Sequence, residues 1–75
     1  MDEGYILSNK FRRAIFDELA SGEKNIERIA KKHRIIHRIA VRVADDFING
    51  GILEKKGNNY VLTDEGEKLA NSIRG

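Results

Sequence analysis

The sequence has no cysteine, no proline and no tryptophan among its 75 residues. The lack of cysteine excludes a disulfide scaffold and a zinc site with cysteine ligands. Long apolar runs are also missing, since the longest are tripeptides such as Ala14–Phe16 and Ile39–Val41, against the ~20 residues that cross a bilayer. Residues 1–6 lack the basic and then apolar pattern of a signal peptide. We therefore expect a cytoplasmic protein with no membrane contact.

The short length predicts a single domain that spans residues 1–75. A chain of this size hides only ~60% of its unfolded surface and supports one core. Hydrophobic residues make up 40% of the chain, which suffices for several short helices and a hairpin but leaves little for a cleft that encloses a substrate. Three serines and two histidines without clustered carboxylates give no convincing nucleophile and base. We expect no enzyme, no cofactor and no metal.

The charge is concentrated in the middle of the chain. Residues 24–42 hold seven Lys or Arg residues and a single acidic residue, Glu27, so their net charge is +6. Residues 1–23 hold three basic against five acidic residues, and residues 43–75 hold four against six, which restores the total of +2. A polyanionic partner responds to such local sums, so the middle third is the expected partner surface.

An amphipathic helix is predicted up to Ala20. Ser8 or Asn9 can cap it, because a short side-chain oxygen accepts the free amide protons of a first helical turn. Its apolar residues recur at every fourth position: Leu7, Phe11, Ile15 and Leu19. The pair Ser21-Gly22 ends the helix, since glycine adopts the left-handed conformation that closes a helix C-terminus.

Two further helices are predicted on either side of a turn near Arg34-Ile35. Asn25 caps the first, which is about two turns long and has its apolar positions at Ile26, Ile29 and Ala30. The second runs over residues 37–49 and ends at Gly50-Gly51. Its expected inward positions are Ile36, Ala40, Ala44 and Phe47, flanked by Val43 and Ile48.

A hairpin and a last helix complete the chain. Residues 52–56 and 60–62 are predicted to be strands, because Gly57-Asn58-Asn59 between them tolerate positive φ at a hairpin tip. Thr63 caps the final helix, and Leu69 and Ile73, one turn apart, anchor it. The predicted fold class is therefore mainly α with a small β-hairpin, in the order helix, helix, helix, strand, strand, helix.

Two stretches resemble a known family. The first is Ile29-Ala30-Lys31-Lys32-His33-Arg34-Ile35, followed by Ala40, Ala44, Phe47 and Gly51–Lys55; the second is Tyr60–Gly66 with Leu69. In order and spacing they resemble the winged helix-turn-helix transcription regulators of the MarR-like and ArsR-like superfamily. The resemblance implies a helix-turn-helix at residues 25–50, a wing at residues 52–62, and double-stranded DNA as the partner. The chain departs from the family at Arg34, where glycine is frequent, at Ile36, where a Ser or Thr cap is usual, and at His33, where leucine commonly packs.

The resemblance also implies roles for individual residues. In such folds the second helix of the motif lies in the major groove, so the side chains opposite its buried face meet the base edges. Those base-reading residues are His37, Arg38, Val41, Arg42 and Asp45. Arg38 or Arg42 suits guanine, Val41 suits a thymine methyl group, and Asp45 orients Arg42 or accepts from a cytosine amine. The residues placed for the DNA backbone, or for the minor groove beside the wing, are Lys31, Lys32, Arg34, Lys55, Lys56, Asn58 and Asn59.

Other interpretations stay open at this level. The basic run alone is compatible with a solvated helix face. The chain is also compatible with a winged-helix module that docks a protein through Tyr5, Ile6 and Phe16, because not all of these side chains are expected to fit one small core. His33 is expected to be a partly buried packing residue, and His33 and His37 lack the Cys or acidic partners that a metal site requires. A homodimer formed through the terminal helices is a further alternative, which Leu69 and Ile73 leave undecided between core and dimer contact.

Overall fold

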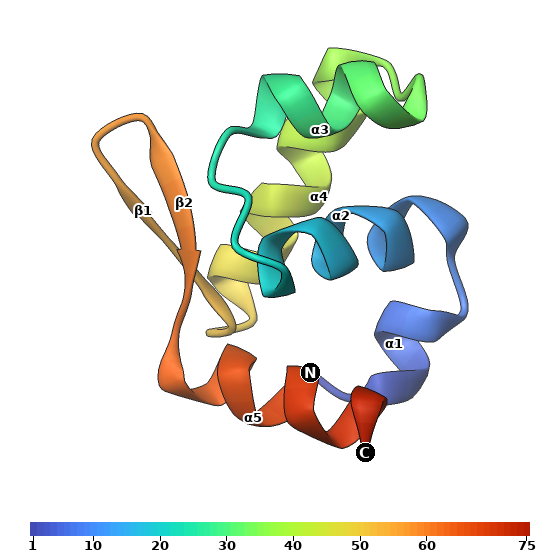
Figure 1. Ribbon diagram of the computed structural model, residues 1–75, viewed down its shortest axis with the longest axis vertical. Helices are drawn as coiled ribbons and strands as arrows, with labels where there is room; N and C mark the ends of the chain where they lie inside the picture. Colours follow the sequence, from blue (N-terminus) through green and yellow to red (C-terminus); the bar gives the residue numbers. More distant parts are fainter.

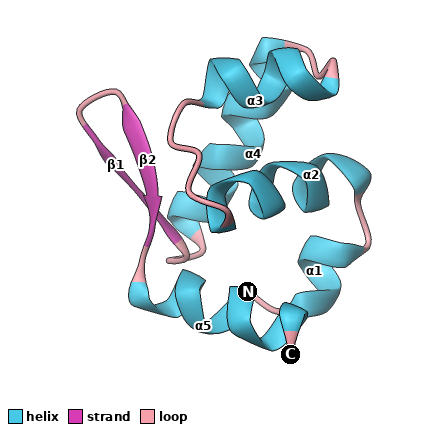
Figure 2. Cartoon of the chain, viewed as in Figure 1, coloured by secondary structure: helices cyan, strands magenta, loops and turns pink.

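The computed structural model describes all residues from 1 to 75 and contains five helices and one antiparallel hairpin. The elements follow one another as α1 (Glu3–Leu7), α2 (Lys10–Ala20), α3 (Ile26–His33), α4 (His37–Asn49), β1 (Leu53–Lys56), β2 (Asn59–Leu62) and α5 (Asp64–Arg74) (Figure 1). The mainly helical class with a small hairpin is confirmed, as Figure 2 shows. The predicted number of four helices is wrong, because the short helix α1 precedes the first predicted one.

Side-chain caps fix where the helices begin. The Asn9 side chain accepts from the amides of Phe11 and Arg12, so Asn9 rather than Ser8 caps α2. Asn25 accepts from the Arg28 amide at the start of α3. Each cap satisfies amide protons that have no partner inside the helix. These starts were predicted from the sequence, and the structure confirms them.

Thr63 caps α5 and also joins this helix to the end of α4. Its hydroxyl accepts from the Gly66 amide and lies 2.6 Å from the Gly51 carbonyl oxygen, to which it donates. The Thr63 amide donates to the Ile52 carbonyl oxygen. One threonine therefore holds the start of α5 against the connection between α4 and β1.

The core lies where α2, α4 and the hairpin meet. The Phe16 and Phe47 rings pack edge to face with centroids 6.0 Å apart and planes at 88°, a favourable arrangement for aromatic rings. Ala40 and Ala44 are fully buried beside them, which confirms the predicted inward face of α4. Ile6 on α1 is fully buried as well, so α1 covers the core although it is only five residues long.

Two predicted core positions are wrong. Leu7 is 42% exposed because it belongs to α1 and the chain turns at Ser8 and Asn9, so the fourfold apolar spacing does not continue from Leu7 into α2. Ile36 is 62% exposed, and Ile35 fills the core in its place with 7% exposure.

The hairpin pairs Leu53 with Leu62 and Lys56 with Asn59. Its two-residue turn is Gly57-Asn58, with Gly57 at φ +62°, so Asn59 lies in β2 and not in the turn. The Tyr60 amide donates to the Lys24 carbonyl oxygen at 2.9 Å. This bond holds β2 against the connection that precedes α3.

The helix α3 and the start of α4 lie at one end of the molecule, and α1 and α5 lie at the other with both chain termini (Figure 1). The helix α4 runs from the first end into the middle of the molecule. The Ser72 hydroxyl lies 2.9 Å from a Glu3 carboxylate oxygen and links α5 to α1. The hairpin extends beside α3 and α4 (Figure 1). No helix has the length and apolar character that a membrane span requires.

Candidate nucleic-acid interface

The turn between α3 and α4 depends on a left-handed residue. Arg34 has φ 54° and ψ 41° and closes α3, its amide donating to the carbonyl oxygens of Ala30 and Lys31. The Ile35 amide donates to the Ala30 carbonyl oxygen at 2.8 Å. Glycine adopts this conformation without strain and arginine does not. At Arg34 the sequence departs from the family pattern, in which glycine is frequent. The backbone nevertheless forms the turn that was predicted there.

The helix α4 presents a polar face opposite its buried one. Arg38, Arg42 and Asp45 are exposed on the side away from Ala40, Ala44 and Phe47, and His37 and Val41 lie at its flank. The structure thus brings the five predicted base-reading residues onto one surface, with Val41 half-buried. Arg42 and Asp45 form no ion pair with each other or with another residue, so the predicted orienting contact is absent.

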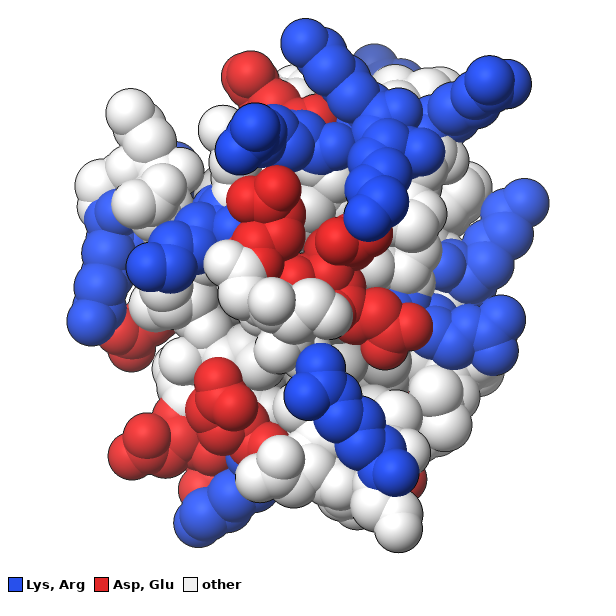
Figure 3. All heavy atoms as spheres, viewed as in Figure 1, with Lys and Arg blue, Asp and Glu red and all other residues white.

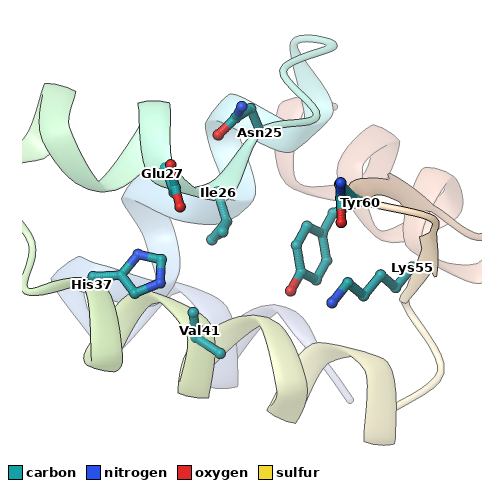
Figure 4. A pocket seen from close by; sticks show the side chains of 8 residues that line it. Asn25, Ile26, Glu27, His37, Val41, Lys55 and Tyr60 are labelled. Atoms are coloured by element: carbon teal, nitrogen blue, oxygen red, sulfur yellow. The ribbon is translucent and has the colours of Figure 1, made fainter.

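A concavity of about 460 Å³ separates this face from the hairpin. It is lined by Asn25, Ile26, Glu27, His37, Val41, Lys55, Asn58 and Tyr60. Figure 4 shows His37 and Val41 on α4 facing Tyr60 and Lys55 on the hairpin across this space. Its charged groups are Lys55 and Glu27. The cleft is open on one side and is mainly polar.

The hairpin separates its two lysines onto opposite faces. Lys55 faces the concavity, with its ammonium nitrogen 5.6 Å from the centre of the Tyr60 ring. Lys56 lies on the other face and pairs with Glu54 at 3.2 Å. Side chains of successive strand residues alternate in this way. Of the predicted hairpin contacts, Lys55 and Asn58 therefore share a surface with α4, and Lys56 does not.

The predicted backbone-contacting cations on α3 differ in their pairing. Lys31 and Arg34 are exposed and form no ion pair. Lys32 lies 2.9 Å from a carboxylate oxygen of Glu18 on α2, and His33 lies 2.7 Å from the same oxygen. These two partners hold the pKa of Glu18 below its ordinary value, the contact with Lys32 contributing most. His33 and Glu18 are 15 positions apart in the chain and meet because α2 packs on α3.

The sequence did not predict a hollow between α2 and the α3–α4 turn. A second hollow lies between the start of α2 and the turn, lined by Lys10, Phe11, Ala14, His33, Arg34 and Ile35. Lys10 on α2 and Arg34 in the turn thus line one hollow. No local pattern joins residues 10 and 34, so only the packing of α2 on α3 shows this.

The residues that favoured a protein-docking module are not free for docking. Phe16 is 1% exposed and Ile6 is fully buried. Tyr5 is half-buried, with the Arg12 guanidinium 3.8 Å from the centre of its ring. Ile6 and Phe16 thus lie in the one core, and Tyr5 packs against it half-buried. No group of three or more His, Cys, Asp or Glu side chains gathers as a metal site would require.

Lys and Arg side chains gather at the end of the molecule formed by α3 and the α3–α4 turn, and Asp and Glu side chains occupy the middle of the same face (Figure 3). The local excess of positive charge in residues 24–42 is thus also an excess in space.

Comparison of the chain with protein-family models, with curated proteins and with solved structures finds no match.

Proposed function

We propose that this chain is a winged helix-turn-helix domain that binds double-stranded DNA and regulates transcription. In this proposal α3 and α4 form the helix-turn-helix, α4 lies in the major groove, and the β1–β2 hairpin is the wing. The observation that supports it most strongly is the row of exposed polar residues on α4, opposite its buried alanines and next to the cations of α3. This is how a recognition helix presents its side chains.

The concavity between α4 and the hairpin agrees with this assignment. If α4 enters the major groove, the adjacent sugar-phosphate strand passes between α4 and the wing. Lys55 and Asn58 on one wall and His37 on the other are suited to its phosphate oxygens. Glu27 also lines the concavity and disfavours a phosphate next to its carboxylate.

The departures from the family pattern are compatible with the proposal. The turn near residue 34 has the required left-handed backbone despite the arginine. Ile36 provides no side-chain cap for α4. The additional helix α1 lies at the far end of the molecule with α5 and adds nothing to the proposed DNA surface (Figure 1).

A charge-matched gel-shift titration tests the proposal. The double variant Arg38→Ala/Arg42→Ala removes two cations from α4, and the control Lys68→Ala/Arg74→Ala removes two from α5. We expect the first to weaken DNA binding at least ~10-fold and the control to change it less than ~2-fold, because a base contact contributes ~1–3 kcal/mol. Equal effects of the two variants, or no binding of any duplex at low salt, would contradict the proposal.

Selection of bound DNA in vitro tests whether the protein binds as a symmetric dimer. Regulators that dimerise bind half-sites about one helical turn apart, ~10 base pairs. Enrichment of a palindrome with this spacing supports a homodimer, and a single short site supports a monomer.

A further inference from the structure

Ile36 is the most exposed large apolar side chain of the protein. Its exposure is 62%, against 47% for Met1 and 42% for Leu7. The backbone explains this position, because the left-handed Arg34 directs Ile35 into the core and the following side chain outward. Covering this exposed side chain with an apolar group of a partner would be favourable, because it removes apolar surface from water.

The position of Ile36 is fixed by the start of α4. Its carbonyl oxygen accepts from the amides of Ile39 and Ala40 at 2.9 and 3.0 Å. The side chain is branched at Cβ and has few accessible rotamers. Ile36 therefore presents a rigid apolar surface at the tip of the proposed recognition helix.

The surroundings of Ile36 are positively charged. Arg34 and Arg38 are exposed cations two residues away on either side, and neither forms an ion pair. A protein partner or a lipid surface that binds through apolar contacts needs a contiguous apolar patch. One isoleucine among cations fits instead a polyanion that carries isolated apolar groups. The 5-methyl group of thymine, in the major groove between two phosphate strands, is such a group.

We infer that Ile36 is a specificity-determining residue that packs against the 5-methyl group of a thymine in the bound DNA. The inference rests on the proposed function and adds a base preference to it. Ile36 acts separately from Val41, the residue that sequence reasoning assigned to a thymine methyl group. Val41 is half-buried and faces the hairpin across the concavity. Ile36 is exposed at the start of α4 and does not line the concavity.

Replacing thymine by deoxyuridine tests the inference, since the two bases differ only in the methyl group. A duplex obtained by in-vitro selection is made in versions that each replace one thymine. We expect the wild-type protein to bind about fourfold more weakly when deoxyuridine replaces one particular thymine of each site. This is the effect of removing one buried methyl group from the contact. The variant Ile36→Ala should bind the unmodified duplex about fourfold more weakly and lose nothing further at that thymine.

Two matched variants separate this contact from general effects. Leu7→Ala shortens another exposed apolar side chain, at the opposite end of the molecule, and Val41→Ala shortens the half-buried one. Both should retain the fourfold loss at the thymine assigned to Ile36. The melting temperatures of all three variants show whether they are folded.

The outcomes distinguish this inference from the proposed function. Binding without any effect of deoxyuridine, or an undiminished effect in Ile36→Ala, overturns the inference and leaves the proposed function standing. A selected site without thymine does the same. Ile36-dependent binding to vesicles of phosphatidylserine and phosphatidylcholine, with no thymine-methyl effect on DNA, overturns it in favour of a lipid surface. Failure to bind any duplex overturns both.

Discussion

At the scale of single residues, Arg34 has a backbone conformation that favours glycine. Its φ of 54° is the only positive value outside glycine, and a side chain there costs roughly 1 kcal/mol. Glycine removes this strain but loses more entropy on folding, so we expect Arg34→Gly to stabilise the fold by a net amount of about 0.5 kcal/mol. The same variant should bind DNA more weakly, since it removes an exposed cation.

The control for this prediction is Arg42→Gly, which makes the same change inside α4. Here the residue is helical, so the variant should destabilise the fold by about 1 kcal/mol. Urea unfolding of the two variants measures both effects. Destabilisation by Arg34→Gly would show that the arginine side chain stabilises the turn by more than the strain it introduces.

Glycine is required at position 66 because the backbone of Ile52 lies very close to it, and not because of a positive φ angle. A Cβ atom there would overlap the Ile52 carbonyl oxygen and lie 3.1 Å from its carbon atom. We expect Gly66→Ala to destabilise the protein by about 2 kcal/mol or more, since backbone must move. Gly4→Ala in α1 is the matched control, because the new Cβ would meet only Asp2 Oδ1 at 3.5 Å. Thermal unfolding should show a lower Tm for the first variant and an unchanged or higher one for the control; equal shifts would contradict this account.

At the scale of elements, Glu18 joins α2 to α3 through Lys32 and His33. These partners lower the pKa of Glu18 below 4.5, its ordinary value. The stabilisation is therefore complete above about pH 4.5 and is lost as the pH falls through the lowered pKa. At pH 7 we expect Glu18→Gln to cost about 0.5–1 kcal/mol, because the ammonium group of Lys32 is well exposed.

Urea unfolding at pH 7 and at pH 3 measures this dependence. The difference in unfolding free energy between wild type and Glu18→Gln should shrink at pH 3. In a Lys32→Gln/His33→Gln background, Glu18→Gln should have little effect at either pH. A difference that is the same at both pH values would show that the charge of Glu18 contributes nothing.

The elements were predictable wherever local chemistry decides them. Asn9, Asn25 and Thr63 begin helices by accepting from nearby amides, and these bonds span at most three residues. The helix α1 was not predictable from periodicity, because five residues contain too few turns. Only its packing reveals that Ile6 is buried and Leu7 is not.

The candidate site also contains features that local sequence predicts and features that depend on packing. The polar face of α4 follows from helical spacing, so its five residues were found together. The choice between Ile35 and Ile36 depends on one φ angle at Arg34, for which the sequence contains no glycine signal. The meeting of Glu18 with His33, and of Lys10 with Arg34, depends on how α2 packs on α3, which no local pattern encodes.

At the scale of the whole molecule, the two ends differ in character. The end formed by α3 and α4 carries the exposed cations of residues 31–42, and the other end holds α1, α5 and both termini. Five of the cations of residues 31–55 are free of ion pairs: Lys31, Arg34, Arg38, Arg42 and Lys55. If each neutralises about one phosphate, the logarithm of the binding constant should fall with the logarithm of salt concentration with a slope of roughly −4.5.

The central claim is that DNA binds across α3, α4 and the hairpin, and NMR titration with a DNA duplex tests it most directly. We expect amide shifts to change at the turn around Arg34, along the first two turns of α4, and at Lys55 and Asn58. The amide chemical shifts of α1 and α5 should not change, because these helices lie at the end of the molecule away from the proposed DNA surface. Changes confined to α1 and α5, or no changes at low salt with the duplex in excess, would contradict the account.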